Sequence, residues 1–275
     1  MTAFIESKFS KVFKDNTIHL LGFPFDATSS YRAGSAKGPD SLREASENLE
    51  TYSPYLQLDL QDLSLADLAN LKTDQFETMI AEFEKLTKDC DLKKQKLITI
   101  GGEHSISIAP IKLHHKFYPD MLVLQLDAHA DLRDEYLGNK NSHACIMRRC
   151  LDFLKTDQIL QYGIRSGTKE EFKWMQENGT QADSLDELCQ RLEKIKQPIY
   201  LTLDLDFFDP SELPGTGTPE AGGESFHSFI RIIKILAQKK LIGADITELS
   251  PNFDPTGRSS CLASKVVREM ILALG

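Results

Sequence analysis

The chain has 275 residues, of which 41% are hydrophobic and 27% are charged. This composition supports a sizeable apolar core and excludes a disordered chain or a small disulfide-stapled scaffold. The net charge is −9, from 32 basic and 41 acidic residues, and the basic residues are scattered, so we expect no nucleic-acid partner. An acidic field attracts cationic small molecules, although many proteins are acidic only because charge keeps them soluble.

The sequence carries no signal for a membrane span, a linker or a second domain. Its apolar runs fall short of the roughly 18 to 20 residues that cross a bilayer, and the opening MTAFIESKFSKVFKDN lacks the apolar stretch of a signal peptide. We therefore expect a cytosolic protein with no membrane partner, in which residues 1–275 form one domain. The five cysteines show no CxxC spacing, which favours reduced thiols over a zinc site.

Short apolar runs alternate with segments of helical period, which predicts strands and helices of a mostly parallel sheet. The expected strands, in chain order, are Thr17–Gly22, Lys96–Ile100, Met121–Leu126, Ile159–Gly163, Ile199–Leu203 and Leu241–Ile246. The expected helices are one that starts near Gly38, then Asp74–Lys88, Ser105–Phe117, Ser142–Leu154, Ser225–Ala237 and Ser260–Leu274. This pattern predicts an α/β fold with a doubly wound sheet.

Polar segments follow five of the expected strands directly. They read GFPFD, GGEHS, DAHAD, DLDFFDP and TELSP in chain order. Because ligands bind at the carboxyl ends of strands in open α/β sheets, we expect these segments to converge on one crevice.

The segment DAHAD is the strongest local signal for a metal site. In an extended chain, Asp127, His129 and Asp131 lie on one side with neighbours about 6–7 Å apart, close enough to share one or two metal ions. The candidate ligands are two histidines and four aspartates: His104, Asp127, His129, Asp131, Asp204 and Asp206.

Taken singly, each motif has a simpler structural explanation. An acidic strand end can be solvated or cap a helix, and a lone histidine usually has a structural role. Together, four carboxylates and two imidazoles in one crevice would repel one another, and bound cations remove that conflict. Oxygen-rich ligation suits Mn²⁺, and bridging carboxylates suit a two-metal site, although Zn²⁺, Fe²⁺ and Co²⁺ fit the same ligand types.

The motifs also resemble, in order and spacing, the ureohydrolase (arginase/agmatinase) family. The similar segments are GGEHS, LDAHADLRDEY, SHACIMRR, LTLDLDFFDPSELPGTGTPEAGG and DITELSPNFDPTGRSS. The resemblance implies a three-layer α/β/α sandwich, two Mn²⁺ ions per subunit and a homo-oligomer, commonly a trimer or hexamer. It implies one Mn²⁺ held by His104, Asp127, Asp131 and Asp204, and a second held by Asp127, His129, Asp204 and Asp206.

The resemblance also implies a reaction, in which a hydroxide that bridges the two metal ions attacks a guanidinium carbon and urea is released. Asp206 or Asp131 is then the candidate proton carrier for the leaving amine. His143 resembles the family's proton-shuttling histidine, and Glu248 resembles its guanidinium-binding carboxylate. Without the resemblance, a helix-capping His143 and a solvated Glu248 are the simpler interpretations.

The loop Leu132–Lys140 bears on which guanidino compound is the substrate. It resembles the agmatinase-like branch, and Asp134 and Glu135 would favour a cationic amine tail. Arg133 could pair with these acids or receive a carboxylate. We therefore predict that agmatine is hydrolysed to urea and putrescine.

Other activities stay open at this stage. Within the family these are the activities of an arginase, a guanidinobutyrase or an aminopropylagmatine ureohydrolase. Outside it, the same carboxylates would serve a metal-dependent deacylase or phosphoesterase. A binding protein without activity is a further alternative.

Overall fold

The computed structural model describes residues 2–72 and 75–275, built around a parallel eight-stranded sheet. In order across the sheet the strands are β1 (Lys8–Phe9), β5 (Leu65–Asn70), β2 (Ile18–Phe23), β6 (Lys96–Gly101), β10 (Leu241–Thr247), β9 (Ile199–Asp204), β7 (Leu122–Leu126) and β8 (Ile159–Tyr162). Each neighbouring pair in this sheet is parallel. A short antiparallel pair, β3 (Tyr52–Ser53) and β4 (Leu58–Asp59), lies apart from it.

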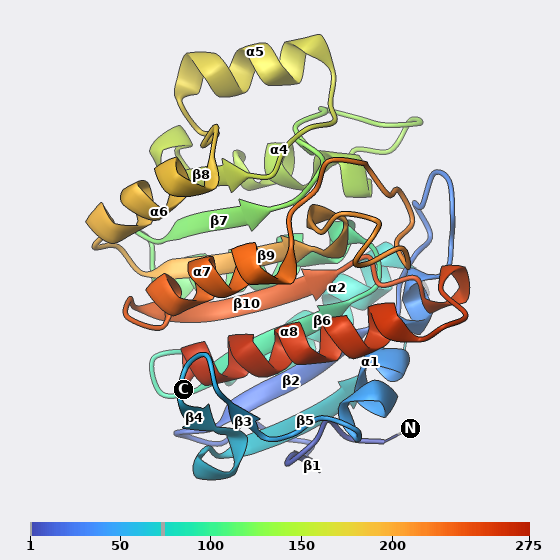
Figure 1. Cartoon of the computed structure of the whole chain (residues 1–275), viewed down its shortest axis with the longest axis vertical. Helices are drawn as coiled ribbons and strands as arrows, with labels where there is room; N and C mark the ends of the chain where they lie inside the picture. The colour runs from blue at the N-terminus through green and yellow to red at the C-terminus, as the bar shows by residue number, and fades with distance from the viewer. Residues whose placement is uncertain (1, 73–74) are drawn as a thin grey trace.

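Helices cover both faces of the sheet. They are α1 (Gly38–Ser46), α2 (Phe76–Thr87), α3 (Ile108–Phe117), α4 (Ile146–Cys150), α5 (Lys169–Asn178), α6 (Leu185–Lys194), α7 (Phe226–Leu236) and α8 (Arg258–Leu274). Buried residues of α1, α6, α7 and α8 share one core cluster, and those of α2, α3, α4 and α5 share the other. Figure 1 shows α7 and α8 in front of the sheet and α2 behind it. The predicted three-layer α/β/α sandwich is confirmed.

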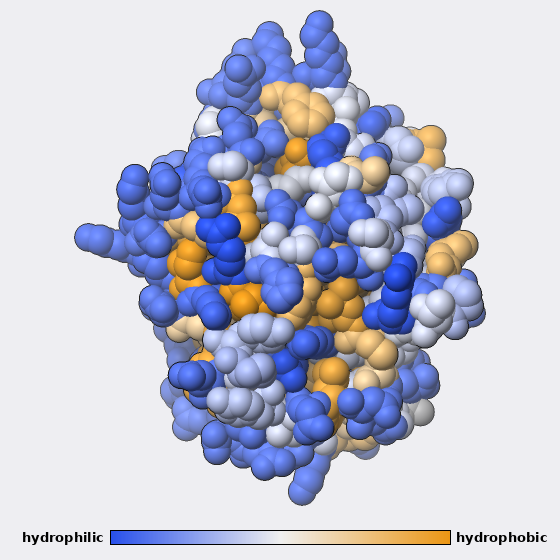
Figure 2. All heavy atoms as spheres, viewed as in Figure 1, coloured by the Kyte–Doolittle hydropathy of each residue, from blue (hydrophilic) through white to orange (hydrophobic). Residues whose placement is uncertain are grey.

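The alternation of side chains along the strands explains the two cores. In β9, Ile199 and Leu201 belong to one cluster, whereas Tyr200 between them belongs to the other. Figure 2 shows that hydrophilic side chains dominate the face that α7 and α8 cover, with apolar side chains visible between them. No helix of the described residues is long and apolar enough to cross a membrane.

All six expected strands form within one or two residues of their predicted bounds, but other elements differ. The expected helix Ser142–Leu154 is broken into a 3₁₀ turn at His143–Cys145 followed by the short α4. The expected start of the second helix at Asp74 lies outside the described residues. The pattern of apolar runs also missed β5, because this strand carries the charged Asp67 in its middle.

Asp67 is buried because Arg43 of α1 neutralises it. The Nε and Nη2 atoms of Arg43 donate to the two Asp67 carboxylate oxygens at 2.8 and 2.9 Å, and Nη1 donates to Asn70 at 2.6 Å. Neither Arg43 nor Asp67 is exposed. The pair ties α1 to β5.

Replacing Arg43 by methionine is expected to lower the free energy of unfolding by about 3–5 kcal/mol, because Asp67 keeps a buried charge without its partner. Urea denaturation measures this change. As a control, Lys88→Met removes the exposed pair with Asp89 and is expected to change stability by less than about 1 kcal/mol. Equal effects of the two substitutions would contradict the structural role of Arg43.

Candidate metal centre

The predicted metal ligands lie together at the carboxyl ends of three strands, β6, β9 and β7, and β10 lies between β6 and β9 in the sheet. His104 follows β6, the segment Asp127–Asp131 follows β7, and Asp204 ends β9. Residue 102 must be glycine for the turn after β6, since a Cβ there would lie 1.8 Å from the carbonyl oxygen of Phe25. The convergence expected from the strand ends is therefore present.

His104 is the centre of the first group of ligands. Its Nδ1 atom lies 3.1 Å from carboxylate oxygens of both Asp127 and Asp131 and 3.4 Å from Asp204. This nitrogen is buried and makes no hydrogen bond within the described residues. Its other nitrogen, Nε2, lies 2.8 Å from the Thr202 hydroxyl, which itself donates to Asp245. Nε2 is thus the nitrogen that donates to Thr202, and Nδ1 faces the carboxylates, where it can serve as a metal ligand.

His129 is the centre of the second group. Its Nδ1 atom lies 2.9 Å from Asp206 Oδ2 and 3.8 Å from Asp127 Oδ1. Ligand atoms of His104, Asp127 and Asp204 lie within 4.8 Å of one another, and so do those of Asp127, His129 and Asp206. Asp127 therefore belongs to both groups, whereas Asp204, which the resemblance also assigns to both, belongs to the first group only.

Without a bound cation, the neighbouring carboxylates of this cluster repel one another. Burial, together with repulsion from neighbouring aspartates, raises the pKa of Asp127 and of Asp204 above the ordinary range. Burial acts the same way on Asp206, but the His129 imidazole beside it holds the pKa of Asp206 below the usual value. Carboxylates so crowded fit a site for cations.

Glu248 comes from the end of β10 and faces the same space. Its Oε1 atom accepts the backbone N–H of His104 at 2.8 Å, and its own N–H donates to Gly102 at 2.7 Å. Glu248 has a φ of 67°, and Asp131 a φ of 54°, in the left-handed region that non-glycine residues rarely occupy. Such backbone conformations are frequent at functional sites.

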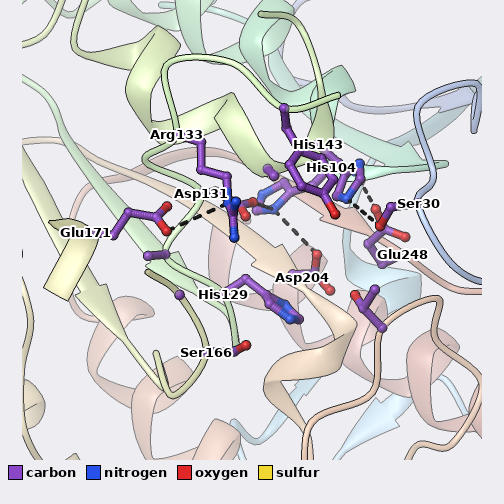
Figure 3. A pocket seen from close by; sticks show the side chains of 15 residues that line it. Ser30, His104, His129, Asp131, Arg133, His143, Ser166, Glu171, Asp204 and Glu248 are labelled. Carbon is purple, nitrogen blue, oxygen red and sulfur yellow. Dashed lines mark hydrogen bonds and ion pairs between the residues drawn. The ribbon is translucent and has the colours of Figure 1, made fainter. Parts of the chain in front are cut away.

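A cavity of about 240 Å³ opens beside these ligands. Its lining includes Ser30, His104, His129, Asp131, Arg133, Tyr136, His143, Glu171, Asp204, Thr218 and Glu248. Figure 3 shows Glu171 and Glu248 on opposite sides, with Asp131 and His104 between them. His143 thus lies on the cavity wall, with its ring edge-on to Tyr136.

Asp134 and Glu135 lie elsewhere, contrary to the expectation that they meet the substrate. Both are exposed, and neither lines the cavity. Asp134 instead accepts a hydrogen bond from Arg149 at 2.7 Å and lies 3.3 Å from Lys140. These cations draw its side chain away from the cavity.

The acid that does line the outer wall is Glu171, which the sequence did not single out. Its oxygens accept the backbone N–H groups of Leu132 and Thr168, and Arg133 Nε lies 3.9 Å away. Glu171 closes the capping box that starts α5 at Thr168. The spacing Thr168-x-x-Glu171 is a recognisable sequence signal for that helix.

An α/β/α sandwich with acids and imidazoles converging at its strand ends defines an enzyme scaffold with a candidate binuclear metal site. The sequence model of the arginase family matches residues 16–273. The chain therefore belongs to the arginase family, as an agmatinase-like ureohydrolase.

Individual relatives agree with this assignment. The agmatinase of Bacillus subtilis is 38% identical over 265 residues, which cover 92% of this chain and 90% of the relative. The N(1)-aminopropylagmatine ureohydrolase of Thermococcus kodakarensis is 37% identical, covering 84% and 82% of the two chains. The crystal structure of a putative agmatinase from Clostridium difficile superposes with a TM-score of 0.88 at 38% identity, covering 95% of this chain and 98% of the other.

Proposed function

We propose that the protein is a Mn²⁺-dependent agmatinase that hydrolyses agmatine to urea and putrescine. The observation that carries the proposal is a cavity with Glu248 and the two ligand groups at its base and Glu171 on its outer wall. Agmatine has a guanidinium group at one end and an amine at the other, so it offers a cation to each of these regions.

Two metal ions fit the ligands that the chain provides. The Nδ1 atom of His104 is buried among three carboxylates without a hydrogen bond, and a bound cation satisfies this nitrogen and the carboxylates together. Oxygen ligands outnumber imidazoles, which suits Mn²⁺. When bound, two such ions supply a water molecule of lowered pKa.

Glu248 is the residue that orients the guanidinium group. The hydrogen bond from His104 N–H fixes the carboxylate next to the metal ligands. Burial, and repulsion from Glu103, raise the pKa of Glu248 well above its ordinary value, so its ionised form is favoured when a cation lies against it. A guanidinium group is such a cation, with paired N–H donors that match a carboxylate.

Proton transfer to the leaving amine falls to Asp206 or Asp131, which lie beside the reacting group in this arrangement. Asp131 lines the cavity, and Asp206 Oδ2 contacts two residues that line it, since it lies 2.9 Å from His129 Nδ1 and accepts the Thr218 hydroxyl at 3.3 Å. A carboxylate so placed takes a proton from the attacking water and returns it to the amine.

His143 exchanges protons between the cavity and solvent. It is partly exposed, and its ring nitrogens lie 3.3 Å from the Thr28 hydroxyl and 3.5 Å from the Ser30 hydroxyl. An imidazole can accept a proton at one ring nitrogen and donate one from the other, so this side chain can relay protons.

Glu171 favours an amine rather than a carboxylate at the tail of the substrate. Its carboxylate is fixed by two backbone donors, and the Arg133 guanidinium beside it stacks on Tyr136 at 4.9 Å. A terminal ammonium is attracted by Glu171, whereas a carboxylate is repelled. The tail of aminopropylagmatine carries the same charge, so the experiment has to compare the two amines.

Urea release should be measured with Mn²⁺ present for agmatine, aminopropylagmatine, guanidinobutyrate and arginine. We expect agmatine to be turned over most efficiently, and Glu171→Gln to weaken the preference for amine tails over guanidinobutyrate. No urea from any of the four would refute the function. Amide or phosphate-ester hydrolysis in its place would select a metal-dependent deacylase or phosphoesterase.

A further inference from the structure

A row of polar side chains crosses the buried sheet just before the metal ligands. In the strand register, Gln161 of β8 pairs with Gln125 of β7, Gln125 pairs with Thr202 of β9, and Thr202 pairs with Asp245 of β10. All four are fully buried. A polar row inside an apolar sheet is costly unless its hydrogen bonds are made, so each of these bonds constrains the structure.

Gln125 contacts the metal-binding segment directly. Its amide nitrogen donates one hydrogen to Asp127 Oδ2 at 2.8 Å and the other to the backbone carbonyl of His129 at 3.1 Å. Both partners are acceptors in the ionised site. A flipped amide would turn the Gln125 oxygen toward a carboxylate and a carbonyl, so only one orientation is compatible with Asp127.

Two further residues fix that orientation. Gln161 donates to the Gln125 side-chain oxygen at 2.7 Å and to the Ala130 carbonyl at 3.2 Å. The Thr180 hydroxyl donates to the Gln161 side-chain oxygen at 2.8 Å. Donation therefore runs in one direction, from Thr180 through Gln161 and Gln125 to Asp127, and all the amide hydrogens of both glutamines are used.

Asp127 is the carboxylate that belongs to both ligand groups. Its Oδ2 lies 3.1 Å from His104 Nδ1, and its Oδ1 accepts the N–H of His129 at 2.6 Å. Gln125 and this backbone donor therefore hold one oxygen each. Rotation of the carboxylate, which would exchange the oxygens between the two groups, breaks both bonds.

We infer that Gln125 is a positioning residue for Asp127, and that Gln161 and Thr180 set the orientation of its amide. This inference rests on the proposed two-metal site. Partners outside the ligand sphere commonly change metal affinity by about 10–100-fold when they are removed. Because Asp127 is shared, loss of Gln125 affects both ions.

The test is Mn²⁺ binding by the full chain, measured by calorimetry and by the rise of the melting temperature with added Mn²⁺. Gln125→Met has a similar length and no donor, and we expect about 10–100-fold weaker Mn²⁺ binding. At saturating Mn²⁺, kcat for agmatine should fall while KM changes little, since Gln125 does not line the cavity. Unchanged Mn²⁺ affinity overturns the positioning role.

A matched pair at Thr180 gives an independent result even if Gln125→Met does not fold. Thr180→Ser keeps the hydroxyl and should bind Mn²⁺ like the wild type, whereas Thr180→Val removes the donor and should bind it more weakly. Equal affinities in this pair overturn the proposed relay. If the wild type binds no Mn²⁺, the metal centre itself is refuted; if it binds two ions and Gln125→Met binds them equally, only the positioning role fails.

Discussion

Replacing Asp127 by asparagine is expected to abolish urea release and the binding of at least one of two Mn²⁺ ions. Asp127 contributes one oxygen toward each ligand group. Asparagine removes the negative charge and turns an N–H₂ donor toward one cation. The loss of activity should exceed the roughly 10–100-fold typical of substitutions outside the ligand sphere. Urea assays and metal analysis of the purified variant measure both effects.

Asp134→Asn is the matched control for this substitution. Asp134 has the same side chain and lies seven residues further along the chain, but it pairs with Arg149 and Lys140 outside the cavity. It should retain wild-type activity and metal content. Full activity of Asp127→Asn with two bound ions would contradict a shared ligand, and a large loss in Asp134→Asn would restore its predicted contact with the substrate.

The sequence predicts the base of the site better than its outer wall. Six metal-ligand candidates could be found because apolar runs in the sequence predict the strands, and the carboxyl ends of these strands meet in a parallel sheet. Asp134 and Glu135 could not be placed, because the turn at Asp131, with its φ of 54°, redirects the chain. Glu171 could not be linked to the site either, since it comes from α5, after the next strand.

The same limit explains the missed elements of the fold. β5 carries a buried charge, and only the tertiary contact with Arg43 makes that strand compatible with the sheet. The polar helix α5 has few buried side chains, so its apolar period is weak, and its capping box is the clearer signal. Gln125 and Gln161 likewise belong to apolar-looking strands, and their roles depend on the register between strands.

Replacing Glu248 by glutamine is expected to raise KM for agmatine by about 10–150-fold, which corresponds to about 1.5–3 kcal/mol for one charged hydrogen bond. Glutamine keeps the oxygen that accepts His104 N–H, so Mn²⁺ affinity should change far less than in Asp127→Asn. Steady-state kinetics with saturating Mn²⁺ separates the effect on KM from that on kcat. An unchanged KM would contradict guanidinium binding by Glu248.

The same variant carries a second expected result, which concerns stability. The pKa of Glu248 is raised in the folded protein, first by burial and then by repulsion from Glu103. A carboxyl whose pKa is raised in the folded state contributes stability at pH values below its pKa in the unfolded chain. That contribution is lost as the pH rises toward its pKa in the folded protein. At neutral pH the Glu248 carboxyl is therefore destabilising compared with a neutral side chain, and Glu248→Gln should melt at a higher temperature in chelator-treated samples. Below about pH 4, where both states are protonated, the difference should vanish. A variant that binds agmatine weakly and yet melts higher at neutral pH would show that this carboxylate is retained for the substrate at the expense of stability.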